Sequence, residues 1–162
     1  MVDIDLVNKV SDKLKKQKKT IATAESCTGG LLAHTFTNIP GSSDYFDRGV
    51  VTYSNKAKTE LLGIPEVLLT KYGAVSNEVA AAMADAIRKN ALVDYGLATT
   101  GIAGPTGGTK DKPVGLVYIA LSMKNDRIVK RLLFTNDRLT NKDNTCNAAL
   151  KLLLETLSKN KS

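Results

Sequence analysis

Residues 20–30 of the chain read Thr20-Ile-Ala-Thr-Ala-Glu-Ser26-Cys-Thr-Gly-Gly30 and decide how the fold is interpreted. The first half alternates and contains β-branched residues, which predicts a strand over 20–25. The second half leads into an apolar run that predicts a helix over 28–38. A serine at a strand-to-helix turn stands where enzymes expose a nucleophilic hydroxyl. The alternative is that Ser26 only caps the helix, the commonest role of a serine at that position.

Outward from this stretch, predicted helices and strands alternate along the chain. We expect helices over 4–17, 54–62, 77–90 and 138–158, a short helix after Pro65, strands over 47–53, 93–100, 114–123 and 127–134, and fraying from Ser158. Strands that alternate with helices imply a largely parallel sheet covered on both faces. The last two strands, joined by Lys124-Asn-Asp126, imply an antiparallel hairpin. We therefore predict one α/β domain over residues 1–162, with a mixed, largely parallel sheet.

The composition restricts the class of protein. Of the 162 residues, 43% are apolar and 24% charged, which is ordinary for a globular protein. No apolar run approaches the ~20 residues that cross a bilayer, and the N-terminus does not resemble a signal peptide. Cys27 and Cys146 form no CxxC pair, so we expect no disulfide. These features predict a cytoplasmic protein with no membrane partner.

The net charge of +7 permits an interpretation as a nucleic-acid-binding protein. Six lysines lie between Lys9 and Lys19, where Val7, Val10 and Leu14 recur at helical spacing. That pattern favours a solvated face of an amphipathic helix. No aromatic residues interleave with these lysines for base stacking, so we do not expect a nucleic-acid partner.

Three predicted strands end on a hydroxyl-bearing side chain, Ser26, Tyr53 and Thr100. The carboxyl ends of parallel strands meet at one edge, where ligands bind in open α/β sheets. His34 is the only histidine and has no partners for a metal site, so a lysine is the remaining candidate base. Lys58 is best placed, because a helix N-terminus and burial both lower the pKa of an amine. Taken singly, Lys58 is more typical of a surface lysine and Tyr53 of a half-buried strand residue.

Backbone groups complete the predicted site. The segment Cys27, Thr28, Gly29 and Gly30 offers amides to an oxyanion and lets a substrate approach closely. Cys27 itself is expected to be a packing residue, with an activated thiol as the alternative. Tyr53 and Thr100 would relay protons or hold the lysine by hydrogen bonds. A further stretch with Gly101, Gly104, Gly107 and Gly108 lacks P-loop spacing and predicts a substrate or capping loop.

Five motifs together resemble the CinA C-terminal domain family, which includes the stand-alone bacterial nicotinamide-nucleotide amidases. In chain order they are Ala24-Glu-Ser26-Cys-Thr-Gly-Gly30, Tyr53-Ser-Asn-Lys-Ala-Lys58, Gly73-Ala-Val-Ser76, Thr100-Gly-Ile-Ala-Gly-Pro105 and Lys112-Pro-Val-Gly115. The resemblance covers nearly the whole chain. It implies a serine/lysine amidohydrolase that converts nicotinamide mononucleotide to nicotinate mononucleotide and ammonia in pyridine nucleotide recycling.

The resemblance also implies roles for single residues. Ser26 matches the nucleophile and Lys58 the base, with Tyr53 and Thr100 in support. The family fold is a three-layer α/β/α sandwich, its members use neither metal nor organic cofactor, and they are commonly homo-oligomers. Some relatives carry a fused N-terminal molybdopterin-binding-like domain, which we do not expect here.

One departure from the family concerns phosphate recognition. The family often has two arginines four residues apart before the last helix. Here Arg138 matches the first, but Lys142 stands at the second and weakens a bidentate clamp. We expect Arg138 and the amides of Gly101 to Gly108 to bind the 5′-phosphate, the alternative being a surface arginine that begins a helix. Two other functions stay open: a non-catalytic nucleotide-binding module and a DNA-associated competence or damage accessory protein.

Overall fold

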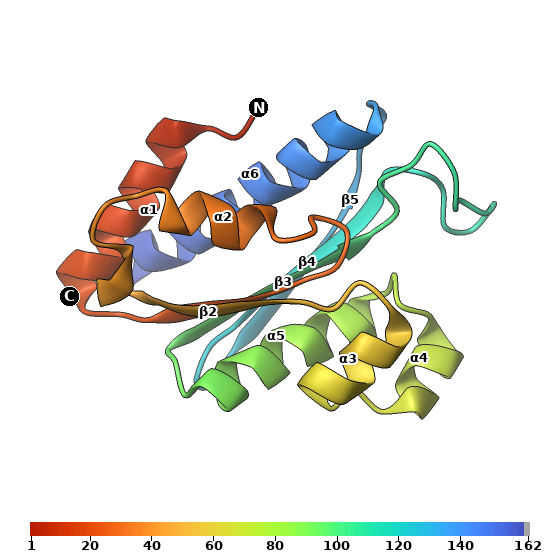
Figure 1. Cartoon of the computed structure of the whole chain (residues 1–162), viewed down its shortest axis with the longest axis horizontal. Helices are drawn as coiled ribbons and strands as arrows, with labels where there is room; N and C mark the ends of the chain where they lie inside the picture. The colour runs from red at the N-terminus through yellow and green to blue at the C-terminus, as the bar shows by residue number, and fades with distance from the viewer. Residues whose placement is uncertain (161–162) are drawn as a thin grey trace.

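The computed structural model describes residues 1–160, built around a five-stranded sheet (Figure 1). The strands are β1 (Ile21–Glu25), β2 (Phe46–Val51), β3 (Tyr95–Gly101), β4 (Leu116–Ser122) and β5 (Arg127–Leu133), in the spatial order β2-β1-β3-β4-β5. Strand β1 lies between β2 and β3 and pairs in parallel with both. The pairs β3–β4 and β4–β5 are antiparallel. The predicted α/β fold with a mixed sheet and an antiparallel hairpin is confirmed, and its parallel part consists of β2, β1 and β3.

Helices cover both faces of the sheet (Figure 1). One face carries α1 (Ile4–Gln17), α2 (Leu31–Thr37) and α6 (Arg138–Lys159); the other carries α3 (Asn55–Leu62), α4 (Glu66–Tyr72) and α5 (Asn77–Ala91). A short 3₁₀ helix, Ser42–Asp44, precedes β2. Two apolar clusters result, one on each face of the sheet. The chain is therefore arranged in three layers, as the sequence pattern predicts.

Local sequence explains where several helices begin and end. Helix α1 starts after Asp3, whose side chain accepts a hydrogen bond from the Leu6 amide, and it buries the predicted apolar stripe. Ser76 caps α5 by accepting from the Val79 amide. Helix α3 ends at Gly63, which adopts a left-handed backbone with φ of +66°. These bounds agree with the sequence prediction to within a residue.

Helix α5 packs against small residues of the sheet. The cluster beneath it contains Ala22, Ala24, Ala98 and Ala120 from three neighbouring strands. At Gly96 a Cβ would lie 2.2 Å from the carbonyl oxygen of α5 residue 84, so a larger residue there would displace the helix.

Two element ends differ from the sequence prediction and affect the site. Helix α2 begins at Leu31 and not at 28, because Gly29 and Gly30 have φ of +61° and +99°. Residues 26–30 therefore form a turn, which we call the nucleophile turn. Strand β2 ends at Val51, which pairs with the last residue of β1, so Tyr53 lies beyond the sheet.

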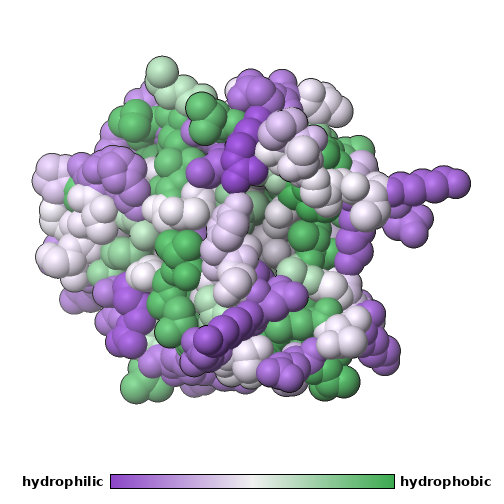
Figure 2. Space-filling view, turned by 45° about the vertical axis from the view of Figure 1, so that its right-hand side comes forward, coloured by the Kyte–Doolittle hydropathy of each residue, from purple (hydrophilic) through white to green (hydrophobic). Residues whose placement is uncertain are grey.

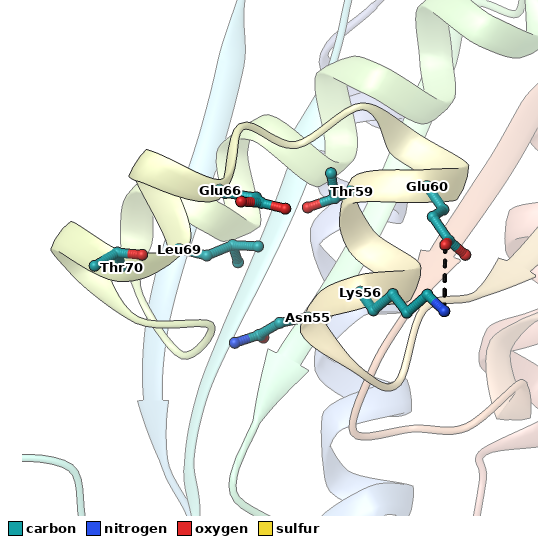
Figure 3. Close-up of a pocket in the computed structure, with 7 residues that line it drawn as sticks. All are labelled: Asn55, Lys56, Thr59, Glu60, Glu66, Leu69 and Thr70. Carbon is teal, nitrogen blue, oxygen red and sulfur yellow. Dashed lines mark ion pairs between the residues drawn. The ribbon is translucent and has the colours of Figure 1, made fainter.

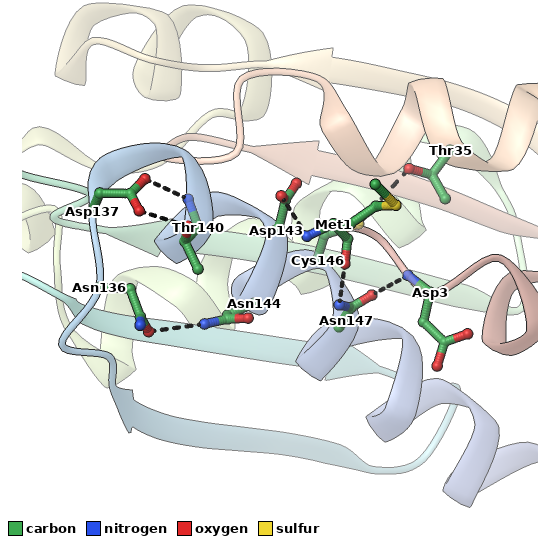
Figure 4. A network of polar contacts seen from close by, with 10 residues as sticks. All are labelled: Met1, Asp3, Thr35, Asn136, Asp137, Thr140, Asp143, Asn144, Cys146 and Asn147. Carbon is green, nitrogen blue, oxygen red and sulfur yellow. Dashed lines mark hydrogen bonds and ion pairs between the residues drawn. The ribbon is translucent and has the colours of Figure 1, made fainter.

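The first and last helices of the chain pack against each other (Figure 4). The amide of Asp3 donates to Asn147 Oδ1 at 2.8 Å, and Asn147 Nδ2 donates to the Met1 carbonyl at 3.1 Å. The prediction of fraying from Ser158 is wrong for Ser158 and Lys159, which are helical. The rest of that predicted tail includes residues 161–162, which lie outside the described residues.

Among residues 1–160, no helix has both the length and the apolar character to cross a bilayer. Figure 2 shows hydrophilic and hydrophobic residues interspersed over the face it presents. Both cysteines are free and buried. Residues 1–160 contain no group of three or more histidine, cysteine or carboxylate side chains placed to hold a metal ion.

Candidate active site

A cavity of about 260 Å³ lies where the three parallel strands end. Ser26 follows β1, Tyr53 follows β2, and Thr100 lies near the end of β3. The structure thus brings together the three strand-end residues and Lys58. The cavity is lined by Ser26, Cys27, Tyr53, Lys58, Ala74, Val75, Thr100, Gly101, Ile102, Ala103, Gly104, Thr106, Gly107 and Arg138.

Ser26 and Lys58 are in direct contact. The lysine Nζ lies 3.1 Å from the serine Oγ. Ser26 is 7% exposed and Lys58 only 1%, so the pair is nearly closed off from water. Lys58 is the fourth residue of α3, whose start is fixed by Ser54 accepting from the Ala57 amide. The chain after β2 therefore folds back and carries the lysine to the end of the neighbouring strand.

The surroundings of Lys58 favour its neutral form. Burial lowers the pKa of its amine from the ordinary value of 10.5, and the nearby thiol of Cys27 opposes this to a lesser degree. None of the ion pairs among residues 1–160 includes Lys58. A buried amine without a counter-ion loses its proton more readily, and the neutral amine can accept the proton of Ser26.

Backbone carbonyls, rather than the predicted hydroxyls, hold the lysine. Lys58 Nζ donates to the carbonyl of Thr52 at 2.8 Å and to that of Tyr53 at 3.4 Å. The hydroxyl of Thr100 instead donates to the Ala74 carbonyl at 2.8 Å. Among residues 1–160, no hydrogen bond joins the Tyr53 phenol or the Thr100 hydroxyl to the lysine, and the alternative that these two groups relay protons stays a prediction. Tyr53 lies beyond the end of β2 and is 58% exposed, and its hydroxyl accepts a hydrogen bond from Arg138.

The nucleophile turn places backbone amides beside Ser26. The amide of Gly29 donates to the Ser26 carbonyl at 3.1 Å, which closes the turn. Within residues 1–160, the amides of Cys27 and Thr28 donate to no backbone carbonyl of another residue. The sequence predicts that these two amides lie at the start of a helix. In the structure they belong to a turn that precedes the helix. They are the nearest candidates along the chain for binding an oxyanion formed at Ser26.

Cys27 is unsuited to act as the nucleophile. Burial, the largest cause, raises the pKa of its thiol to about 12, and the thiol is 6% exposed. A protonated, buried thiol is a poor nucleophile at neutral pH. The interpretation of Cys27 as a packing residue that also lines the cavity fits these observations.

The predicted binding glycines divide into two groups. Gly101, Gly104 and Gly107 line the cavity, as does Cys27. The structure does not place Thr28, Gly29, Gly30 or Gly108 in the cavity lining. Gly108 packs against the next part of its own loop, where a Cβ would lie 2.7 Å from the Val114 nitrogen.

Helix α6 fixes the loop that follows β3. Asn141 Nδ2 donates to the Ala103 carbonyl at 3.0 Å, and Arg138 donates to that of Gly104 at 2.7 Å. Farther along the loop, Lys112 Nζ donates to the Tyr72 carbonyl at the end of α4, at 2.6 Å. The cavity wall is therefore held from both faces of the sheet.

Arg138 joins two sides of the cavity. Besides the Gly104 carbonyl, its guanidinium donates to the Tyr53 hydroxyl at 3.0 Å. Lys142 lies one turn farther along α6, and a Cβ on Gly29 would be 3.7 Å from its Nζ. Two cations from α6 thus lie beside the cavity and the nucleophile turn. A guanidinium keeps further N–H donors after these two bonds, which leaves Arg138 able to bind an anion.

Sequence reasoning missed several cavity residues. Ala74 and Val75 belong to the motif Gly73-Ala-Val-Ser76, but their small apolar side chains carry no chemical signal. Within the glycine-rich loop, Ile102 and Ala103 are likewise apolar, and the Thr106 hydroxyl does not lie at the end of a predicted strand. Only the folded position of a residue of this kind reveals that it shapes a cavity.

A larger cavity, of about 540 Å³, lies between α3 and α4 (Figure 3). Its residues are Asn55, Lys56, Thr59, Glu60, Glu66, Leu69 and Thr70. Lys56 and Glu60 form an exposed ion pair of 3.6 Å across one turn of α3. Size alone does not identify a reactive site, and the smaller cavity holds both the hydroxyl and the buried amine.

Curated relatives resemble this chain over most of its length. A "CinA-like protein" from Syntrophus aciditrophicus is 49% identical over 157 residues, 96% of this chain and 37% of that protein. A "putative competence-damage inducible protein" from Moorella thermoacetica is 54% identical over 138 residues, 85% of this chain and 33% of that protein. The chain thus spans about a third of the length of the curated relatives it matches.

Solved structures and a family model agree with this relationship. The competence damage-inducible protein A (ComA) from Klebsiella pneumoniae superposes with a TM-score of 0.95 at 32% identity, covering 99% of this chain and 100% of that chain. The competence/damage inducible protein CihA from Agrobacterium tumefaciens gives 0.93 at 36% identity, covering 98% of each. The model described as the CinA C-terminal domain matches residues 3–157. This chain belongs to the CinA C-terminal domain family.

Proposed function

We propose that this protein is a serine/lysine amidohydrolase that deamidates nicotinamide mononucleotide to nicotinate mononucleotide and ammonia. The observation that carries the proposal is the Lys58 amine, buried without a counter-ion and 3.1 Å from the Ser26 hydroxyl. Such a pair supplies a nucleophile and a base without a histidine.

The reaction begins with transfer of the Ser26 proton to neutral Lys58 as Oγ attacks the carboxamide carbon. The amides of Cys27 and Thr28 stabilise the negative oxygen of the tetrahedral intermediate. Protonated Lys58 then donates its proton to the departing nitrogen, which leaves as ammonia, and an acyl ester on Ser26 remains. In the second half, Lys58 takes a proton from water as water attacks the ester. Collapse of that intermediate returns the proton to Ser26 and releases the carboxylic acid.

Arg138 supports a substrate that carries an anion. Its guanidinium lies at the cavity, and its remaining donors suit a phosphate group. Lys142 adds positive charge one helical turn away, although an ammonium provides no planar fork for two phosphate oxygens. A nucleotide whose carboxamide reaches Ser26 and whose phosphate meets Arg138 satisfies both groups. The resemblance to nicotinamide-nucleotide amidases adds weight to this substrate.

The direct test is ammonia release from a panel of nicotinamide compounds. We expect the purified protein to release ammonia from the mononucleotide, and mass spectrometry to show the acid product, one mass unit heavier because OH replaces NH₂. Free nicotinamide, its riboside and the dinucleotide define the range of substrates, and Ser26→Ala is the control for a contaminating amidase. Binding of the mononucleotide without any product would show that the protein is a nucleotide-binding module.

A further inference from the structure

Glu25 is a buried carboxylate that takes part in no step of the proposed reaction. It is the last residue of β1, directly precedes Ser26 and has 0% of its surface exposed. None of the ion pairs among residues 1–160 includes it. A carboxylate taken out of water without a cation is costly unless hydrogen-bond donors satisfy it. The donors around Glu25 therefore show what this residue does.

One of the three donors to Glu25 belongs to the nucleophile turn, and the other two belong to α2, which follows it. Oε1 accepts from the amide of Leu32 at 2.8 Å and from the hydroxyl of Thr28 at 2.7 Å. Oε2 accepts from the amide of Ala33 at 3.0 Å. Leu32 and Ala33 lie in the first turn of α2, where backbone amides lack partners within the helix. The N-cap residue, Gly30, has no side chain to bind them, so Glu25 supplies this cap from the preceding strand.

These bonds tie the two ends of the nucleophile turn together. The side chain of Glu25 spans from the end of β1 to the start of α2, and Ser26 lies inside the loop that it closes. Thr28 extends the connection, because its hydroxyl also lies 2.7 Å from that of Thr99 on β3. Both oxygens of Glu25 are engaged with the turn and with α2, and neither bonds to Lys58.

We infer that Glu25 is a positioning residue, which holds the Ser26 hydroxyl and the neighbouring amides in the geometry that the acyl transfer needs. The reaction in this inference is that of the proposed function, on which the inference rests to that extent. The role of Glu25 itself is inferred from its hydrogen bonds. Glu25 acts through the backbone of the turn and supplies no proton. Loss of its contacts should therefore lower the acylation rate and leave the base, Lys58, unchanged.

The test uses Glu25→Gln and a substrate that does not depend on nucleotide recognition. Glutamine has the same shape, but its NH₂ group cannot accept from an α2 amide, so one hydrogen bond is replaced by two facing donors. The acyl donor is p-nitrophenyl acetate: Ser26 forms an acetyl ester, and p-nitrophenolate leaves. The rate of nitrophenolate release and the mass of the acetylated protein are both measured, with Ser26→Ala subtracting acetylation at other sites.

Glu25→Gln should reduce the rate of Ser26 acetylation roughly 10- to 100-fold, the range that a displacement of up to about 1 Å costs in oriented reactions. The pH midpoint of acetylation should match that of the wild type, because the environment of Lys58 is unchanged. A role confined to stability predicts a lower melting temperature with an unchanged rate well below it. The control Ser122→Ala removes a buried hydroxyl that donates to Asp85, at the opposite end of the sheet, and should show that pattern.

A second pair of variants decides the matter where Glu25→Gln fails to fold. Thr28→Ser keeps the hydroxyl that donates to Glu25, whereas Thr28→Val removes it at nearly constant volume. The valine variant should acetylate more slowly than the serine variant, because only serine keeps the hydroxyl that donates to Glu25. A folded Glu25→Gln protein, or in its absence Thr28→Val, with wild-type acetylation would overturn the inference, as would a wild-type protein whose Ser26 is not acylated at all. Acylation of Ser26 without ammonia release from the mononucleotide would refute only the proposed substrate.

Discussion

Replacing Lys58 by methionine should remove most of the activity and leave the fold in place. Methionine has nearly the length of lysine and suits an enclosed site, so the variant deletes the amine with little change in volume. The lost group is the one that lies 3.1 Å from Ser26 Oγ, within reach of direct proton transfer. No other residue of the cavity lining carries an amine. Arg138 also lines the cavity, but a guanidinium keeps its proton and cannot act as a base.

The magnitude follows from the role of the amine. A positioned general base contributes roughly 10²- to 10⁴-fold, which raises the activation free energy by about 3–5 kcal/mol when it is lost. The variant also leaves the Thr52 carbonyl without its donor at 2.8 Å, which costs about 1–3 kcal/mol of folding free energy. Relief from burying an amine offsets part of that cost. Since domains are stable by about 5–15 kcal/mol, the variant should stay folded.

The assay is ammonia release from nicotinamide mononucleotide, with circular dichroism and thermal unfolding to verify the fold. Lys58→Met, Ser26→Ala and the double variant form a cycle, in which the double variant should be no slower than Ser26→Ala alone. Additive losses would show that the two residues do not act as one unit. Nearly full activity in a folded Lys58→Met protein would refute the assignment of Lys58 as the base.

Four other predictions concern pH, phosphate and the thiol. Activity should rise with pH as Lys58 passes its lowered pKa, and a flat profile with chemistry rate-limiting would contradict a lysine base. Because the pKa of Lys58 in the folded protein lies below the ordinary 10.5, the unfolded chain binds more protons at pH values between the two. The free energy of unfolding should therefore rise with pH across that window, and Lys58→Met should remove this contribution. Arg138→Ala should weaken binding of the mononucleotide by about 1.5–3 kcal/mol more than binding of the riboside, measured by calorimetry, whereas equal losses would indicate a general role in shaping the cavity. Cys27→Ala should keep near wild-type ammonia release, since a thiol with a pKa of about 12 is protonated at neutral pH, and a large loss in a folded variant would point to a role for the sulfur.

Much of the fold could be predicted because local signals and tertiary packing agree. The spacing of Val7, Val10 and Leu14 predicts α1, and these side chains are fully buried in the apolar cluster on that face of the sheet. The caps at Ser76 and Gly63 mark the start of α5 and the end of α3. Each of these signals lies within one or two helical turns of the feature that it marks.

The parts that could not be predicted depend on distant contacts. A glutamate at the end of a strand is typical of a solvated position. Glu25 is nevertheless buried, because two backbone amides at the start of α2 donate hydrogen bonds to its carboxylate. The bond of Arg138 to Tyr53 joins residues 85 positions apart. The end of β2 at Val51 is set by the length of its partner strand rather than by its own sequence. The chain order of hydroxyls and lysine indicated the cavity, but not which carbonyls would hold the amine.

The packing of the first helix on the last one has a consequence for synthesis on the ribosome. Helix α1 is made before α6, and its stripe of Val10 and Leu14 shares a core with Leu150 and Leu153, which are made only when α6 is synthesised. Until then the nascent chain exposes that apolar surface, which is the condition in which partly made proteins associate wrongly or recruit chaperones. The same helix brings Arg138 to the cavity. A ribosome-bound fragment that already contains Ser26 and Lys58 therefore lacks the finished cavity until α6 has docked.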